Sequence, residues 1–212
     1  MDYNFIVIEG NIGAGKTTLA KKIAEEYNAK LIPEEFAENP FLPKFYKDPD
    51  KYSFPLELSF LADRFHQLNK EIRYRDLFKS FIIADYYFTK SLIFAKNTLK
   101  DDEYKLYYRI FNIIYSSLPK PDLYVYLYLD VHNILNNIKL RGRDYEKNIK
   151  PEYLKKIQTG YFEYMKQHQD EFKFLVIDTN NINFVKNPED YKKITETIFE
   201  KEYEIGINRV IL

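Results

Sequence analysis

The feature that most constrains this chain is a glycine-rich loop that directly follows a short apolar run. Phe5-Ile6-Val7-Ile8 has the character of a buried parallel strand, and residues 17–27 have a helical pattern. The loop matches G-x-x-x-x-G-K-[ST] with Gly10, Asn11, Ile12, Gly13, Ala14, Gly15, Lys16 and Thr17, and Thr18 follows. Glycines let backbone N–H groups turn onto an anion, and a helix N-terminus favours negative charge. This arrangement predicts a phosphate-binding loop, in which Lys16 reaches the β- and γ-phosphate oxygens of ATP and the Thr17 hydroxyl ligates Mg²⁺.

The rest of the chain alternates between strand and helix patterns. Further strands are expected at residues 30–33, 81–85, 123–129 and 174–177, and further helices at 56–73, 103–117, 134–140, 151–169 and 188–202. Residues 34–55 carry prolines at positions 40, 43, 49 and 55, so this stretch is expected to be mostly loop with short helical pieces. The alternation predicts an α/β chain with a doubly wound, five-stranded parallel sheet flanked by helices, forming one domain over residues 1–212.

Ligands of such sheets gather at the carboxyl ends of the strands. Four residues of interest are predicted to lie there: Gly10, Glu34, Asp85 and Asp130. The alternative is that Glu34 is an ordinary acidic residue of a solvent-exposed loop with no role in a site.

The amino-acid composition limits the classes of partner that this chain is expected to bind. Lys plus Arg and Asp plus Glu both number 32, so no global positive field is available to hold a nucleic acid polymer. The absence of cysteine excludes disulfides and thiolate metal sites, and it suits a cytoplasmic protein. The N-terminal residues lack a basic segment, and only four apolar residues follow them, so neither a signal peptide nor a membrane span is expected. The expected partners are therefore small molecules.

Three segments in order carry a resemblance to a known family. They are Glu9 to Thr18, Glu34 with the later Glu38-Asn39-Pro40-Phe41, and Leu140-Arg141-Gly142-Arg143. They resemble, respectively, the phosphate loop, the Glu-Pro-x-x-x-Asn-Pro segment and the lid of the deoxynucleoside kinases, and the likeness runs from about residue 2 to residue 178. The resemblance implies a P-loop kinase fold with an arginine-containing lid. It also implies ATP-dependent phosphorylation of the 5′-hydroxyl of a deoxynucleoside to the 5′-monophosphate, in nucleotide salvage.

The resemblance also implies roles for individual residues. Glu34 would be the general base for the 5′-hydroxyl. Arg141 and Arg143 would clamp the phosphoryl group in transfer. The alternative is a basic helix C-terminus, but Gly142 between two arginines suits a flexible lid better than a helix cap. Tyr46 and Glu146 match the pair that holds the sugar 3′-hydroxyl. The family also pairs through helices, so a homodimer formed through residues 103–117 is considered.

Glu57 and Arg64 occupy the positions at which the family reads the base. They are seven residues apart on one predicted helix, so they share a face and lie ~10 Å apart along its axis. The family has Gln and Arg at these two positions. An ionised Glu offers acceptors only, so Arg64 must meet any acceptor on the base. Guanine and adenine fit this division, but cytosine and thymine can be drawn in the same way. The expected preference for purines is implied mostly by the closer resemblance to the purine-using members of the family.

The chain departs from the family after the third predicted strand. The family acid is present as Asp85, which suits Mg²⁺, but Tyr86 replaces the arginine that follows it. Another cation, such as Arg64 or a lid arginine, would have to cover for that arginine. Two alternatives therefore stay open: a kinase for another small acceptor, such as a nucleoside monophosphate, and a nucleotide-binding interaction module with weakened catalysis. A GTPase is disfavoured because the chain has no Asn-Lys-x-Asp segment.

Lys16→Ala and Glu34→Gln are expected to fail in different ways. Loss of Lys16 removes a phosphate contact, so it should weaken the use of ATP with every acceptor. Glu34→Gln should lower kcat by about 10²–10⁴-fold while ATP still binds, because only the proton acceptor is lost. Steady-state kinetics with varied ATP, together with ATP-binding measurements, separate the two cases. A near-normal kcat in Glu34→Gln would remove the general-base assignment.

Overall fold

The computed structural model describes residues 3–35, 39–74, 76–143, 146 and 149–212, and within them six parallel strands form one sheet. The strands are β1 (Phe5–Gly10), β2 (Lys30–Ile32), β3 (Ile82–Ala84), β4 (Leu123–Tyr128), β5 (Lys173–Asp178) and β6 (Gly206–Ile211). Their order is β2-β3-β1-β4-β5-β6. β1 thus lies between β3 and β4, where the strand order reverses, and the carboxyl end of such a strand is the usual ligand position in this architecture.

The predicted α/β class and parallel sheet are confirmed, but the predicted count of five strands is wrong. The sixth strand, β6, pairs with β5 at the edge of the sheet, with Phe174 opposite Ile207 and Ile177 opposite Val210. β6 contains Asn208 and Arg209, and its alternate residues are exposed. An edge strand with one open face lacks the continuous apolar run by which the other strands were predicted.

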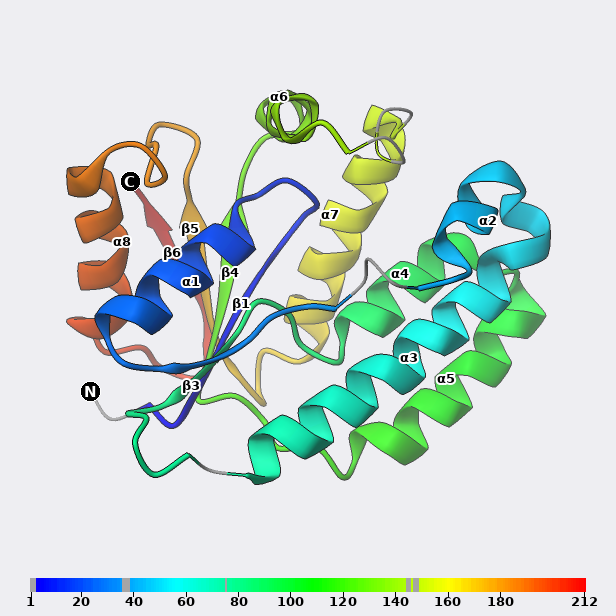
Figure 1. Cartoon of the computed structure of the whole chain (residues 1–212), viewed down its shortest axis with the longest axis horizontal. Helices are drawn as coiled ribbons and strands as arrows, with labels where there is room; N and C mark the ends of the chain where they lie inside the picture. The colour runs from blue at the N-terminus through cyan, green and yellow to red at the C-terminus, as the bar shows by residue number, and fades with distance from the viewer. Residues whose placement is uncertain (1–2, 36–38, 75, 144–145, 147–148) are drawn as a thin grey trace. The chain divides into compact units, whose positions relative to one another are not determined.

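The chain divides into two compact units (Figure 1). The sheet unit comprises Met1–Pro33, Asp76–Tyr86 and Lys120–Leu212, and the helical unit comprises Glu34–Arg75 and Tyr87–Pro119. The helices of the sheet unit are α1 (Lys16–Glu26), α6 (Val131–Arg141), α7 (Pro151–Gln167) and α8 (Pro188–Phe199). Those of the helical unit are α2 (Leu42–Lys47), α3 (Pro49–Arg73), α4 (Lys90–Thr98) and α5 (Asp101–Tyr115). The assignment of residues 1–212 to one domain stays a prediction. Within the described ranges, no helix has the length and apolar character needed to cross a bilayer.

Helices cover both faces of the sheet. One face packs against α1 and α8 through Ile6, Ile8, Leu123, Val125, Leu127, Leu175 and Ile177 of the strands, Leu19 and Ile23 of α1, and Ile194 and Ile198 of α8. Aromatic rings fill the space between the other face and α7, with Tyr126 at 5.0 Å from Tyr161 and Tyr124 at 5.1 Å from Phe174 between ring centroids. These aromatic side chains therefore belong to the core of the sheet unit.

The helical unit contains more helix than the sequence predicted. The long helix α3 begins at Pro49, seven residues before the predicted start, and α4 was not predicted. Pro49 occupies the first helical position, where a missing N–H has no consequence, and the Asp48 side chain accepts a hydrogen bond from the Lys51 N–H at 3.3 Å. Pro55 lies inside α3. The prediction that this stretch is mostly loop was therefore wrong, because Pro49 starts α3 and Pro55 is tolerated within it.

The interior of the helical unit holds one carboxyl group among aromatic rings. Phe88 stacks on Phe111 at 4.9 Å between centroids, and Tyr107 is fully buried. Glu57 of α3 is 3% exposed, and its Oε1 accepts a hydrogen bond from Thr98 Oγ1 at 2.8 Å. Burial raises the pKa of Glu57 to about 7, although the Thr98 hydrogen bond and the charge of Arg64 both oppose this shift.

The stability of the chain should therefore fall as pH rises from about 4.5 to about 7, because the folded state keeps the Glu57 proton that the unfolded chain releases. Glu57→Gln removes this titration. The free energy of unfolding of the variant minus that of the parent should be about 2–3 kcal/mol larger at pH 8 than at pH 5. Urea unfolding at both pH values measures the difference, with Asp63→Asn, an exposed acid on α3, as the control. Equal differences at the two pH values would contradict the prediction.

Candidate functional site

The glycine-rich loop of the sheet unit joins β1 to α1, and its backbone conformation requires glycine at both ends. Gly10 has φ +152°, and a Cβ there would lie 2.8 Å from the Leu127 carbonyl oxygen of β4. Gly15 has φ +91°, and a Cβ there would lie 2.6 Å from Phe184 Cζ. The loop thus turns tightly between neighbouring strands and ends at the N-terminus of α1, as the motif predicted.

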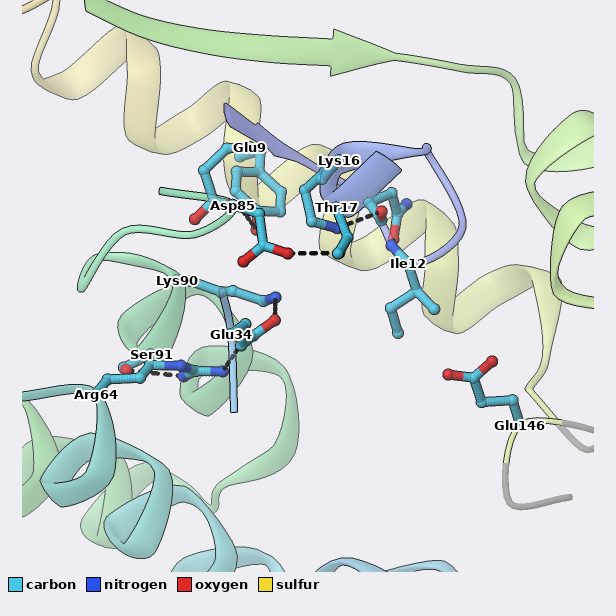
Figure 2. Close-up of polar contacts among 12 residues, drawn as sticks. Glu9, Ile12, Lys16, Thr17, Glu34, Arg64, Asp85, Lys90, Ser91 and Glu146 are labelled. Atoms are coloured by element: carbon cyan, nitrogen blue, oxygen red, sulfur yellow. Dashed lines mark hydrogen bonds and ion pairs between the residues drawn. The ribbon is translucent and has the colours of Figure 1, made fainter. Parts of the chain in front are cut away.

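Hydrogen bonds to two other helices, α6 and α7, hold the loop in place. Asn11 is buried and donates from Nδ2 to the Leu154 carbonyl of α7 at 2.8 Å, and Asn137 of α6 donates to the Gly13 carbonyl at 2.9 Å. Lys16 donates from Nζ to the Asn11 carbonyl at 2.9 Å, so its ammonium lies over the loop (Figure 2). The loop is therefore supported from both sides, with its cation at the phosphate position.

Thr17 and Asp85 lie together, as their common metal assignment requires. Asp85 follows β3 directly and is 2% exposed, and Thr17 Oγ1 donates a hydrogen bond to its Oδ2 (Figure 2). No group of three or more His, Cys, Asp or Glu side chains gathers as a metal site among the described residues. A hydroxyl and one carboxylate beside a phosphate loop are nevertheless the donor set that suits Mg²⁺, which keeps water and phosphate oxygens as its remaining ligands.

A second buried carboxylate lies at the end of β1, directly before the loop. Glu9, the last residue before Gly10, is fully buried, and Tyr161 of α7 donates to its Oε2 at 2.8 Å. Burial and the Glu9 charge raise the pKa of Tyr161 well above its usual value, so the hydroxyl remains a donor. The sequence analysis identified Glu9 only as the start of the family motif. Its partner lies 152 residues away, so no local signal indicates the pair.

The predicted lid arginines share one carboxylate in the sheet unit. Arg141 ends α6 and Gly142 caps it in the left-handed conformation with φ 70°, as in an ordinary helix C-terminus. Arg141 donates from Nε to Glu146 Oε2 at 3.0 Å, and Arg143 donates to Oε1 at 3.4 Å. Glu146 is 6% exposed. The structure thus brings Arg141, Arg143 and Glu146 together.

Two other residues of the family match are not part of the described sheet unit. Tyr46, expected to act with Glu146, belongs to α2 of the helical unit and is 39% exposed. Glu38, part of the family segment after Glu34, lies outside the described residues.

In the helical unit, Glu34 is held by two cations (Figure 2). Arg64 of α3 donates from Nη2 to Glu34 Oε1 at 2.8 Å, and Lys90 Nζ pairs with Oε2. Arg64 also donates from Nη1 to Ser91 Oγ at 2.8 Å. The sequence did not identify Lys90 or Ser91. The available signal was a single lysine within the otherwise uncharged stretch 86–95.

Glu57 and Arg64 each keep one buried polar atom without a partner among the described residues: Glu57 Oε2 and Arg64 Nε. Leaving such an atom unpaired costs about 1–3 kcal/mol, so a partner from a ligand is expected. An acceptor and a donor on one face of α3 form the pair needed to read a polar ring edge. In the sheet unit, Tyr86 is fully buried, so the departure from the family arginine leaves no charge at that position.

Comparisons with known proteins agree with this geometry. The family model for deoxynucleoside kinase matches residues 6–202. A deoxyguanosine kinase of Bacillus subtilis (strain 168) is 36% identical over 199 residues, covering 92% of this chain and 96% of that protein. A deoxyadenosine kinase of Dictyostelium discoideum is 32% identical over 202 residues, covering 92% of this chain and 79% of that protein.

A solved structure carries the same likeness into three dimensions. Deoxyadenosine kinase from M. mycoides, with the products dCMP and a flexible dCDP bound, matches with a TM-score of 0.80 and 27% sequence identity, over 93% of this chain and all of that one. The resemblance seen in the three sequence segments is thereby confirmed, and this chain belongs to the deoxynucleoside kinase family.

Proposed function

We propose that this chain transfers the γ-phosphoryl group of ATP to the 5′-hydroxyl of a deoxynucleoside, with a preference for purines, in nucleotide salvage. The observation that carries the proposal is in the helical unit. There a buried acceptor, Glu57 Oε2, and a buried donor, Arg64 Nε, lack partners among the described residues, while Arg64 also contacts the carboxylate of Glu34. Such a set can bind a base and accept a proton from a sugar hydroxyl.

The phosphate donor is assigned to the sheet unit. The loop from Gly10 to Thr18 would bind the ATP phosphates through backbone N–H groups, with Lys16 on the β- and γ-oxygens. Thr17 and Asp85 would hold Mg²⁺, which, when bound, neutralises phosphate charge. Arg141 and Arg143 would bind the phosphoryl group in transfer, where negative charge develops.

The acceptor is activated by Glu34. As the 5′-oxygen bonds to the γ-phosphorus, the Glu34 carboxylate takes the hydroxyl proton, and the bond from phosphorus to the β-phosphate oxygen breaks to release ADP. Tyr46 and Glu146 are proposed to bind the 3′-hydroxyl. Glu57 and Arg64 are proposed to read the base.

The cellular location and the oligomeric state of the chain are also proposals. A cytoplasmic location fits a reaction that consumes ATP and a cysteine-free chain. Pairing of two copies through α5 stays a prediction, supported by the exposure of Leu106, Tyr108 and Ile113 on that helix.

The direct test is ATP turnover with a panel of acceptors. ADP formation should be stimulated by deoxyguanosine and deoxyadenosine more than by deoxycytidine or thymidine. Stimulation by nucleoside monophosphates instead would support the alternative kinase. Nucleotide binding without turnover for any acceptor would support an interaction module.

The base preference should depend on the charge of Glu57. At pH 8 this carboxylate is mostly ionised and offers acceptors only, which suits the N1–H and amino group of guanine, while Arg64 Nε donates to O6 or N7. Glu57→Gln should change the ratio of kcat/KM for deoxyguanosine over deoxycytidine at least about tenfold, equivalent to about 1.4 kcal/mol. Asp63→Asn on the same helix serves as the control. A ratio that does not change, with all four substrates scaled alike, would leave Glu57 as a structural partner of Arg64.

A further inference from the structure

Lys90 is a buried cation that the assigned roles do not use. It is the first residue of α4 and is 6% exposed. Its ammonium pairs with Glu34 Oε2 (Figure 2). It also lies 5.5 Å from the centroid of the Phe94 ring, one helical turn later. The side chain is thus directed at the proposed general base and held there by an aromatic ring.

Stability gives no reason for a lysine at this position. Positive charge is unfavourable at a helix N-terminus, and taking an ammonium out of water costs several kcal/mol unless it is well paired. The carboxylate that pairs with Lys90 already has a cation on its other oxygen, from Arg64 at 2.8 Å. An apolar side chain of similar length would therefore fold at least as well.

The charges around Glu34 do not balance. Glu34 contributes one negative charge, and Arg64 and Lys90 contribute two positive charges. Among the described residues, Glu57 is the other acid whose charge acts on Arg64. It hydrogen-bonds to Thr98, and burial raises its pKa to about 7, so it is largely neutral below that pH. The cluster thus carries excess positive charge in a buried place, where an anion is favoured.

The transfer reaction supplies such an anion at the right moment. When Glu34 takes the 5′-hydroxyl proton it becomes neutral, and its attraction for the two cations is lost. The same step places a phosphate group on the 5′-oxygen. Since Tyr86 supplies no charge where the family arginine is expected, Lys90 is the cation four positions later in the chain that can meet this need.

We propose that Lys90 is a positioning residue for the transfer: it fixes the Glu34 carboxylate for the 5′-hydroxyl and leaves a cation for the new 5′-phosphate once Glu34 is protonated. The proposal rests on the kinase function proposed above. It assigns to Lys90 the duty that the missing arginine leaves open. Arg64 holds the other Glu34 oxygen and orients the same carboxylate.

The test compares Lys90→Met and Lys90→Arg in the full chain, with Lys96→Met, an exposed lysine on the same helix, as the control. Lys90→Met should lower kcat about 10²-fold and change the KM values for ATP and deoxyguanosine less than about threefold, since charge is needed mainly in the transition state. Its melting temperature should stay level or rise. Lys90→Arg should recover at least about tenfold of the lost kcat because it restores the cation. A structural role would instead lower the melting temperature of Lys90→Met, leave its kcat near normal, or give no recovery with arginine, and any of these results would overturn the proposal.

A double variant tests whether Lys90 acts through Glu34. If it does, Lys90→Met should slow Glu34→Gln clearly less than the roughly 10²-fold by which it slows the parent, because the part of the loss that comes from fixing Glu34 is shared, and only the cation for the 5′-phosphate is left to lose. Losses that multiply would overturn this connection. An unmodified chain that turns over no nucleoside would reject the kinase function and the Lys90 proposal together. An active chain that is indifferent to Lys90→Met would reject the Lys90 proposal alone.

Discussion

The close approach of β1 to β4 at Gly10 is the constraint on which the phosphate loop depends. Gly10 stands opposite Leu127 in the parallel register, and the space beside the Leu127 carbonyl admits no side chain. The chain must therefore turn there with glycine. Asn11 then ties the loop to the Leu154 carbonyl of α7, and Asn137 of α6 donates to the Gly13 carbonyl, so the backbone of the loop is held by two helices. Preorganised donors of this kind need little rearrangement when negative charge develops.

Two carboxylates, Glu9 of the sheet unit and Glu34 of the helical unit, are paired in different ways. In the sheet unit, Glu9 accepts a hydrogen bond from a neutral donor, Tyr161. This contact holds the end of β1 directly before the loop. In the helical unit, Glu34 receives two cations. Buried ion pairs of this kind add little or nothing to stability compared with apolar packing, so their presence points to chemistry rather than to folding.

Glu146 links two assignments that the family resemblance treats separately. The same carboxylate that is proposed to bind the sugar 3′-hydroxyl contacts both lid arginines in the sheet unit. A sugar hydroxyl on Glu146 would compete with these ion pairs. The proposed sugar contact and the freedom of the two arginines are therefore physically coupled, because one carboxylate has a limited number of acceptor positions.

Local signals were enough to predict the features that depend on short stretches of chain. The strand before Gly10, the loop itself and the start of α1 follow from glycine spacing and an apolar run, and the α/β class follows from alternation. The helix boundaries were less accurate where proline was involved, because proline starts a helix as readily as it ends one. Pro49 shows this at the start of α3.

The phosphate loop, the parallel α/β class and the three family segments could be predicted from the sequence, because each depends on short stretches of chain. The partners of the charged groups could not, because they depend on how distant segments fold together. Lys90 reaches Glu34 across 56 positions, and Tyr161 reaches Glu9 across 152. The strand β6 also depends on a distant segment. It lacks a continuous apolar run, and its backbone is ordered as a strand by pairing with β5 at the edge of the sheet. Burial and pairing depend on which distant segments pack together, and no local pattern contains that information.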